Sequence, residues 1–218
     1  MTTDTPSLAR LIAPSLFALA IFYGGMVCIA GVLGNKQVAL GPLAVEAGIF
    51  AFLMLVVTSS AVTELHGPKL ANKLVLWGFV PLLVSLALTL IVLALPASPK
   101  MEPARLEAFN LLLSGTPRIW LGGILAYGIS TLLNVYIFSK LKGREGSKLL
   151  LVRSAVASAL SQAVDTLIFV TVAFYGVFPI AELMGGQMLA KIVLSIVFVP
   201  PLIVLFVKFA RRMDHAPA

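Results

Sequence analysis

The chain of 218 residues is 60% hydrophobic and only 11% charged, whereas soluble domains carry roughly 25% charged residues. Its apolar residues come in runs of about twenty, the length that crosses a hydrocarbon layer of ~30 Å as a helix, which excludes a soluble fold. The net charge of +7 lies mainly in short loops, where it sets topology and contacts anionic lipid rather than nucleic acid.

Six hydrophobic runs predict an all-α membrane protein, a bundle of about six transmembrane helices that forms a single domain over residues 1–218. Inside lipid every backbone polar group must be paired, so each run is expected to be a helix rather than an open strand. The first run is too long for the hydrophobic region of a signal peptide, roughly 7–15 residues, and no cleavable signal is expected. The spans are 12–33, 43–62, 74–95, 119–138, 149–174 and 180–207.

The basic residues of the loops indicate how the chain threads the membrane. Ten of the sixteen Lys and Arg residues fall in the two termini and in the 63–73 and 139–148 loops, whereas the opposite loops hold four. The positive-inside rule therefore places both termini in the cytoplasm. We predict a multi-pass protein of the bacterial inner (plasma) membrane.

The connection 96–118 is more than a simple loop. Leu106, Phe109 and Leu113 share one helical face, so we expect a short interfacial helix over about 103–114. Such a helix is either a plain linker or a lid over a binding cavity, and the sequence leaves both open.

The end of the second run is polar. Ser60 and Glu64 are four residues apart and share a helical face, with Glu64 near the cytoplasmic boundary. Glu64 is either a solvated helix end or a carboxylate that faces a cavity, with His66 and Asn72 nearby. His66 alone is more typical of a boundary residue than of a proton carrier.

The fifth run carries the clearest polar pattern. Its polar residues recur at spacings of three and four and form one stripe along a helix. A central Asp costs about 2.5–3.5 kcal/mol in lipid, so the stripe is expected to face protein or water. Arg153, near the cytoplasmic end, either belongs to this face or extends to the interface. The stripe consists of Ser154, Ser158, Ser161, Gln162 and Asp165.

The sixth run holds a second stripe through Gln187, Lys191 and Ser195. At 1.5 Å per residue, Lys191 lies ~15 Å from the outer side and Asp165 ~18 Å from the inner side, so the two share a similar depth. A structural ion pair would explain both, but intramembrane ionisable groups so often mark substrate paths that we expect a functional role. Asn134, in the fourth run, is expected to add an amide to the same cavity.

Patterns typical of enzymes and metalloproteins do not stand out in the sequence. It contains no GxxxxGK[ST] loop for ATP, no Cys/His set with metal-ligand spacing and no evident nucleophile–base pair. Cys28 is the single cysteine and forms no intramolecular disulfide. We therefore expect no enzyme, no catalytic residue, no metal and no cofactor, and favour a small-solute carrier over an accessory subunit.

Two blocks of sequence carry a family resemblance. One is T-E-x-x-G from Thr63 to Gly67, and the other is RSAVASALSQAVDTLIF from Arg153 to Phe169. Further matches are the Tyr175-Gly176 pair, Lys191, Pro200, and Asn134 before Phe-Ser-Lys. Over essentially its whole length the chain resembles the queuosine precursor transporter family, formerly called the vitamin uptake transporter family.

This resemblance implies import of 7-cyano-7-deazaguanine (preQ0), with its aminomethyl relative (preQ1) as a second candidate, for salvage into the tRNA base queuosine. It also implies a helical shape similar to the substrate-binding subunits of energy-coupling-factor transporters. The alternative function is therefore a substrate-binding or accessory subunit of a multi-protein vitamin or nucleobase importer.

The chemistry of a deazaguanine suits the polar stripes. Its ring N–H and exocyclic amine can both donate to one carboxylate, of Asp165 or Glu64, while Gln162, Asn134 or Lys191 donates to the ring carbonyl. Phe169, Phe138 or Trp77 is expected to stack on the flat face. We expect this small molecule and membrane lipids as partners, no nucleic acid, and leave a homo-oligomer open. The predicted substrate-binding residues are Asp165, Gln162, Lys191, Glu64, Asn134, Ser158, Arg153 and Phe169.

The loop charges generate a direct test of topology. A reporter fused after Ala218 should report a cytoplasmic location, and one inserted near Met101 an external location, because basic loops stay on the cytoplasmic side. An external signal after Ala218 would contradict the six-span arrangement.

Overall fold

The computed structural model describes residues 13–41, 43–114, 117–141, 149–176 and 180–215. Among these residues, six helices are long and apolar enough to span a membrane. The chain is therefore an all-α multi-pass membrane protein, as its hydrophobic runs predicted. Its elements are α1 (Pro14–Leu33), β1 (Gln37–Leu40), β2 (Leu43–Glu46), α2 (Gly48–His66), α3 (Pro68–Ala94), α4 (Pro103–Leu113), α5 (Pro117–Lys140), α6 (Leu150–Phe174) and α7 (Ile180–His215).

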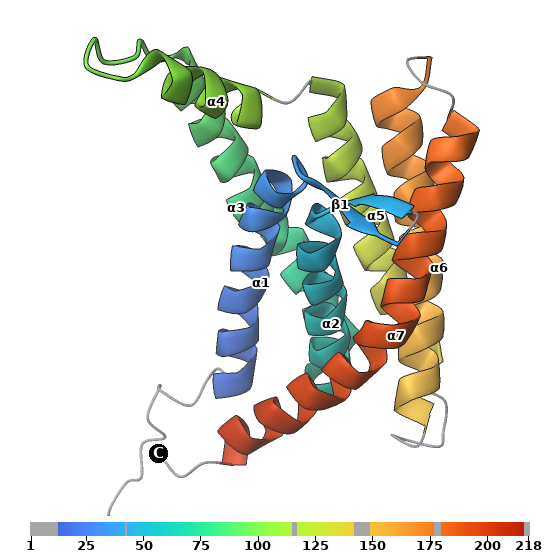
Figure 1. Cartoon of the computed structure of the whole chain (residues 1–218). Coiled ribbons are helices and arrows are strands. Elements are labelled where there is room, and N and C mark those ends of the chain that lie inside the picture. The colour runs from blue at the N-terminus through green and yellow to red at the C-terminus, as the bar shows by residue number, and fades with distance from the viewer. Residues whose placement is uncertain (1–12, 42, 115–116, 142–148, 177–179, 216–218) are drawn as a thin grey trace, which may run out of the picture.

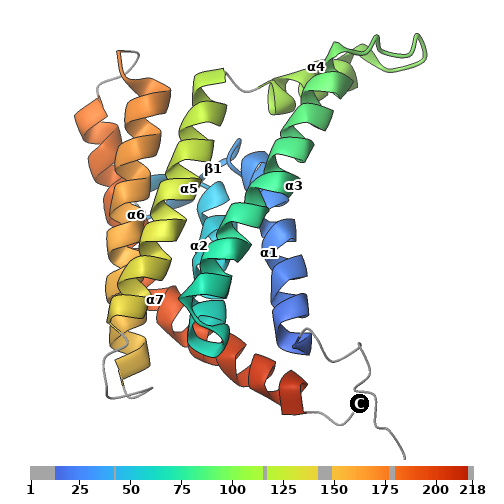
Figure 2. The same cartoon turned by 180° about the vertical axis from the view of Figure 1, so that it is seen from behind.

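Helix α2 is the central helix of the bundle. α1 and α3 pack on one side of it, and α5, α6 and the first half of α7 lie on the other side (Figures 1 and 2). Every residue from Leu55 to Thr63 is buried, as expected for a helix with neighbours on all sides. By contrast, large apolar side chains are exposed along the outer faces of α1, α3, α6 and α7, where they meet lipid. The bundle thus encloses polar residues and exposes apolar ones.

A two-stranded hairpin corrects the predicted start of the second span. The helix was expected to begin at Leu43, but 43–46 pairs antiparallel with 37–40 and α2 begins at Gly48. Gly41, in the turn, has a φ of +61°, a left-handed conformation that glycine adopts without a Cβ clash. A short apolar run is compatible with either a strand or a helix, so composition alone did not predict the hairpin.

Several helices extend beyond their apolar runs. α2 continues to His66 rather than Val62, α3 begins at Pro68 rather than Leu74, and α7 continues to His215 rather than Val207. Hydropathy reports only the part of a helix that suits hydrocarbon, so polar end turns were left out of the predicted spans. Pro200 and Pro201 lie within α7, which bends and passes below α2 toward the start of α1 (Figure 1).

The end of α7 is fastened to the start of α1. Asp214 accepts hydrogen bonds from the backbone N–H of Ser15 at 2.9 Å and from its Oγ at 2.7 Å. The Oγ also lies 2.9 Å from Nε2 of His66, at the end of α2. Asp214 thereby satisfies one of the N–H groups that a helix N-terminus leaves without an intrahelical partner. Three helix ends are thus joined on the side of the bundle where α7 ends.

Two tyrosines tie α1, α3 and α5 together farther along the bundle. The hydroxyls of Tyr23 and Tyr127 lie 3.1 Å apart, and Tyr127 donates to the carbonyl of Val75 at 3.0 Å. Gly78 of α3 leaves room for both rings, because a Cβ there would overlap the Tyr127 hydroxyl and lie 2.8 Å from Cε1 of Tyr23. This close packing fixes the wall of the cavity described below.

Candidate functional site

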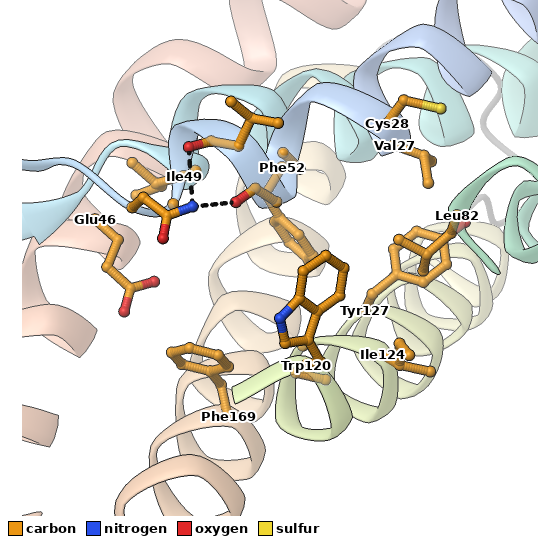
Figure 3. Close-up of a pocket in the computed structure, with 18 of the residues that line it drawn as sticks. Val27, Cys28, Glu46, Ile49, Phe52, Leu82, Trp120, Ile124, Tyr127 and Phe169 are labelled. Carbon is orange, nitrogen blue, oxygen red and sulfur yellow. Dashed lines mark hydrogen bonds between the residues drawn. The ribbon is translucent and has the colours of Figure 1, made fainter. Parts of the chain in front are cut away.

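A cavity of about 390 Å³ lies between the two groups of helices (Figure 3). The volume falls within the range of about 300–1,000 Å³ that is usual for small-molecule sites. α1, the hairpin, α2 and α3 line one part of the wall, and α5, α6 and α7 line the rest. Leu112 and Leu113, at the end of α4, also contribute to the lining. The lining includes the last turns of α1, Glu46 of the hairpin and the end of α4, and these elements lie in the half of the bundle away from the end of α7 (Figure 1).

Asp165 and Lys191 meet at the wall of this cavity. Lys191 Nζ lies 3.2 Å from Oδ2 of Asp165, and Ser130 Oγ donates to Oδ1 at 3.2 Å. Both charged side chains are more than nine-tenths buried. Phe169, one turn farther along α6, has its ring centre 5.8 Å from Lys191 Nζ, close enough for a cation–π contact. The ion pair considered in the sequence analysis is therefore present, and it lies at the cavity wall, while its functional role stays a prediction.

Glu46 contributes a third charge that the sequence analysis missed. It is the last residue of β2, and its side chain points into the cavity on the side of Phe169 (Figure 3). Glu46 lies outside the spanning helices. Burial raises the pKa of its carboxyl, Lys191 opposes this effect, and Asp165 adds to it. Glu46 stands alone in a hydrophobic run, so only the strand pairing reveals where it lies.

The aromatic lining differs in part from the prediction. Phe169 lines the cavity as expected, and Trp120 and Phe52, which were not singled out, line it as well. Trp77 is 70% exposed on the outer surface of α3, so the stacking role considered for it is wrong. Phe138 is fully buried, but it packs against Arg153 and not against the cavity.

A second buried ion pair lies nearer the other end of α6. Arg153 Nη2 donates to Oε2 of Glu64, and the guanidinium lies 4.6 Å from the centre of the Phe138 ring. The two side chains are only 2% and 5% exposed. Arg153 does not extend to the interface and Glu64 is not a solvated helix end, because each satisfies the charge of the other. Neither residue lines the cavity.

A buried polar layer separates the cavity from this ion pair. Asn134 Nδ2 donates to Ser60 Oγ at 3.0 Å, and Ser158 Oγ donates to the Ala155 carbonyl at 3.3 Å. The side-chain amide of Gln162 has no hydrogen-bond partner among the described residues, nor has Oδ1 of Asn134. Buried polar groups are usually paired, so these atoms mark places where a ligand, water or another conformation supplies the partner. Of the eight predicted site residues, the cavity wall thus contains Asp165, Lys191 and Phe169.

Comparison with known proteins identifies the family. A sequence profile for the family described as "Putative vitamin uptake transporter" matches residues 46–205. The chain belongs to the vitamin uptake transporter family. The resemblance seen in the sequence is thereby confirmed.

A named relative adds to this assignment. The chain is 34% identical over 147 residues to the "Probable queuosine precursor transporter" of Bacillus subtilis (strain 168). The match covers 66% of this chain and 62% of the relative's length. No solved structure matches the chain.

The buried Glu64–Arg153 pair predicts that a small change to one side chain has a large effect on the stability of this protein. Glu64→Gln leaves the guanidinium buried without a counter-charge, and the free energy of unfolding should fall by about 3–5 kcal/mol. Glu102→Gln is the matched control, since Glu102 pairs with Arg105 on the surface with both side chains largely exposed, and its effect should stay below about 1 kcal/mol. Thermal unfolding in detergent measures both, and equal shifts would contradict the structural role of the buried pair.

Proposed function

We propose that this transporter imports queuosine precursors, 7-cyano-7-deazaguanine and its aminomethyl relative, across the bacterial inner membrane for salvage into tRNA. The observation that carries the proposal is a cavity within a membrane bundle whose wall combines Asp165 and Lys191 with the flat rings of Phe169 and Trp120. The Bacillus subtilis relative, named as a probable queuosine precursor transporter, supports the same class of substrate.

Recognition of such a base needs one flat apolar surface and a few directed polar groups. Phe169 and Trp120 offer rings on which the bicyclic base stacks. Lys191 donates to the ring carbonyl, and Asp165 holds the ammonium in place through their ion pair. 7-Cyano-7-deazaguanine is neutral, so its passage moves no net charge through the bilayer. A carboxylate at the cavity wall accepts hydrogen bonds from the ring N–H and the exocyclic amine, which together form the donor edge of the base.

The proposed route runs from the cavity to the Glu64–Arg153 pair. With both termini in the cytoplasm, the cavity lies toward the outer side and the ion pair lies toward the cytoplasm. Between them, Gln162 and Asn134 offer hydrogen-bond partners to a passing base. Import then requires α6 to separate from α2 at Arg153 and Glu64, while the cavity closes behind the substrate. This is alternating access around a site near the middle of the membrane.

A salvage assay tests the function. Cells that lack both precursor synthesis and their own carrier are given each precursor at low concentration, and queuosine in tRNA is measured. This protein should restore queuosine, whereas an empty vector should not. If the protein is inserted normally, yet restores no queuosine and binds neither precursor after purification, the proposal is wrong.

The same assay separates a substrate role of the Asp165–Lys191 pair from a purely structural one. Asp165→Asn combined with Lys191→Met removes both charges together, so no buried charge is left unpaired and the variant should fold. If Lys191 binds the ring carbonyl, the folded double variant should lose at least ~10-fold in affinity, and salvage should fail at low precursor concentration. Wild-type salvage by the double variant would show that the pair only holds α6 against α7.

A further inference from the structure

The carboxylate oxygens of the cavity are not equally available to a ligand. Both oxygens of Asp165 have neighbours: Oδ2 has the ammonium of Lys191, and Oδ1 has the hydroxyl of Ser130, which also lies within hydrogen-bond distance of the Ala126 carbonyl. Each carboxylate oxygen has two acceptor sites, so Asp165 could still accept from a ligand. Its charge, however, is already balanced by the buried ammonium of Lys191, so Asp165 has less to gain from a ligand that donates hydrogen bonds than a carboxylate without a partner has.

Glu46 is in the opposite situation. Among the described residues, its carboxylate has no hydrogen-bond partner and no ion pair, although it lines the cavity and interacts electrostatically with Lys191 and Asp165. Glu46 is only partly buried, and the side chain is directed into the cavity (Figure 3). A partly desolvated carboxylate without donors favours any ligand that brings N–H groups.

The hairpin holds this carboxylate at a fixed place. Glu46 pairs in register with Gln37, and the backbone N–H of Ala47 donates to the carbonyl of Lys36 at 2.7 Å, which anchors the end of β2. Trp120 and Phe169 extend from α5 and α6 into the same part of the cavity (Figure 3). Stacking covers the faces of a base and leaves its edge free to meet a polar partner, and Glu46 is such a partner in this cavity.

We propose that Glu46 binds the donor edge of the base and so makes the carrier selective for bases that carry a 2-amino group. The inference rests on the proposed function, because it assigns a recognition residue of that same site. A 2-amino base with a neighbouring ring N–H offers two parallel donors, and the two oxygens of a carboxylate accept both. A base without the amine leaves one buried oxygen unpaired and is rejected for that reason.

The experiment measures binding of two bases to the purified full-length protein by calorimetry. The probes are 7-cyano-7-deazaguanine and the otherwise identical base that lacks the 2-amino group. The wild-type protein should prefer the amino base by at least ~10-fold. Glu46→Gln should bring the two affinities within about 3-fold of each other, since an amide offers one acceptor and turns a donor toward the amine. Glu107→Gln, the same change at an exposed position of α4, should keep the wild-type ratio.

Each outcome bears on one claim. An unchanged ratio in folded Glu46→Gln overturns the role of Glu46, whereas failure of the wild-type protein to bind either base overturns the proposed function instead. If Glu46→Gln does not fold, Glu46→Asp serves as the second variant. Its carboxylate is withdrawn by one methylene, so the ratio should fall below that of the wild type, and an unchanged ratio there also overturns the assignment.

Discussion

A charge inside a bilayer needs a partner from the protein, because hydrocarbon supplies none. In this bundle the constraint falls mainly on α6, which carries Arg153 near one end and Asp165 farther along. Arg153 pairs with Glu64 of α2, and Asp165 pairs with Lys191 of α7. The two charges of α6 are twelve residues apart, or ~18 Å by the helical rise, and they fix its rotation about its own axis. The serines on the same face of α6 are therefore turned into the bundle and away from lipid.

The same constraint explains why irregular backbone is found beside the cavity. Strands exposed to lipid would leave N–H and C=O groups unpaired, but non-helical backbone is tolerated where it is buried in protein or lines a cavity. The hairpin pairs its two strands with each other and directly precedes α2. It thereby brings Glu46 to the cavity wall, where no spanning helix supplies a carboxylate free of other partners among the described residues. The hairpin, which interrupts the helical structure, thus also supplies the candidate recognition residue Glu46.

The two ends of α6 are arranged differently, and the difference suits a carrier. At Asp165 the helices part around a cavity, whereas at Arg153 they meet in a buried ion pair supported by the Phe138 ring. The guanidinium Nε and Nη1 lack partners among the described residues, as does the amide of Gln162. A closed end with unsatisfied donors is less stable than one with every donor paired. This arrangement favours a bundle that opens at that end, as the proposed import requires.

Sequence by itself determined the membrane class, the six apolar helices and the inward face of α6, because each follows from run length or from helical spacing within one segment. It also placed Asp165 and Lys191 at a common depth, since helical rise is the same everywhere. The tertiary structure decided which partners each of these side chains contacts. Glu64 and Arg153 are 89 positions apart, and the sequence left each open between a boundary position and an inward-facing one until α2 and α6 are packed together. In the sequence, Glu46 is a single charge within a hydrophobic run. Its place at the cavity follows only from the pairing of β2 with β1, because strand pairing depends on a partner segment.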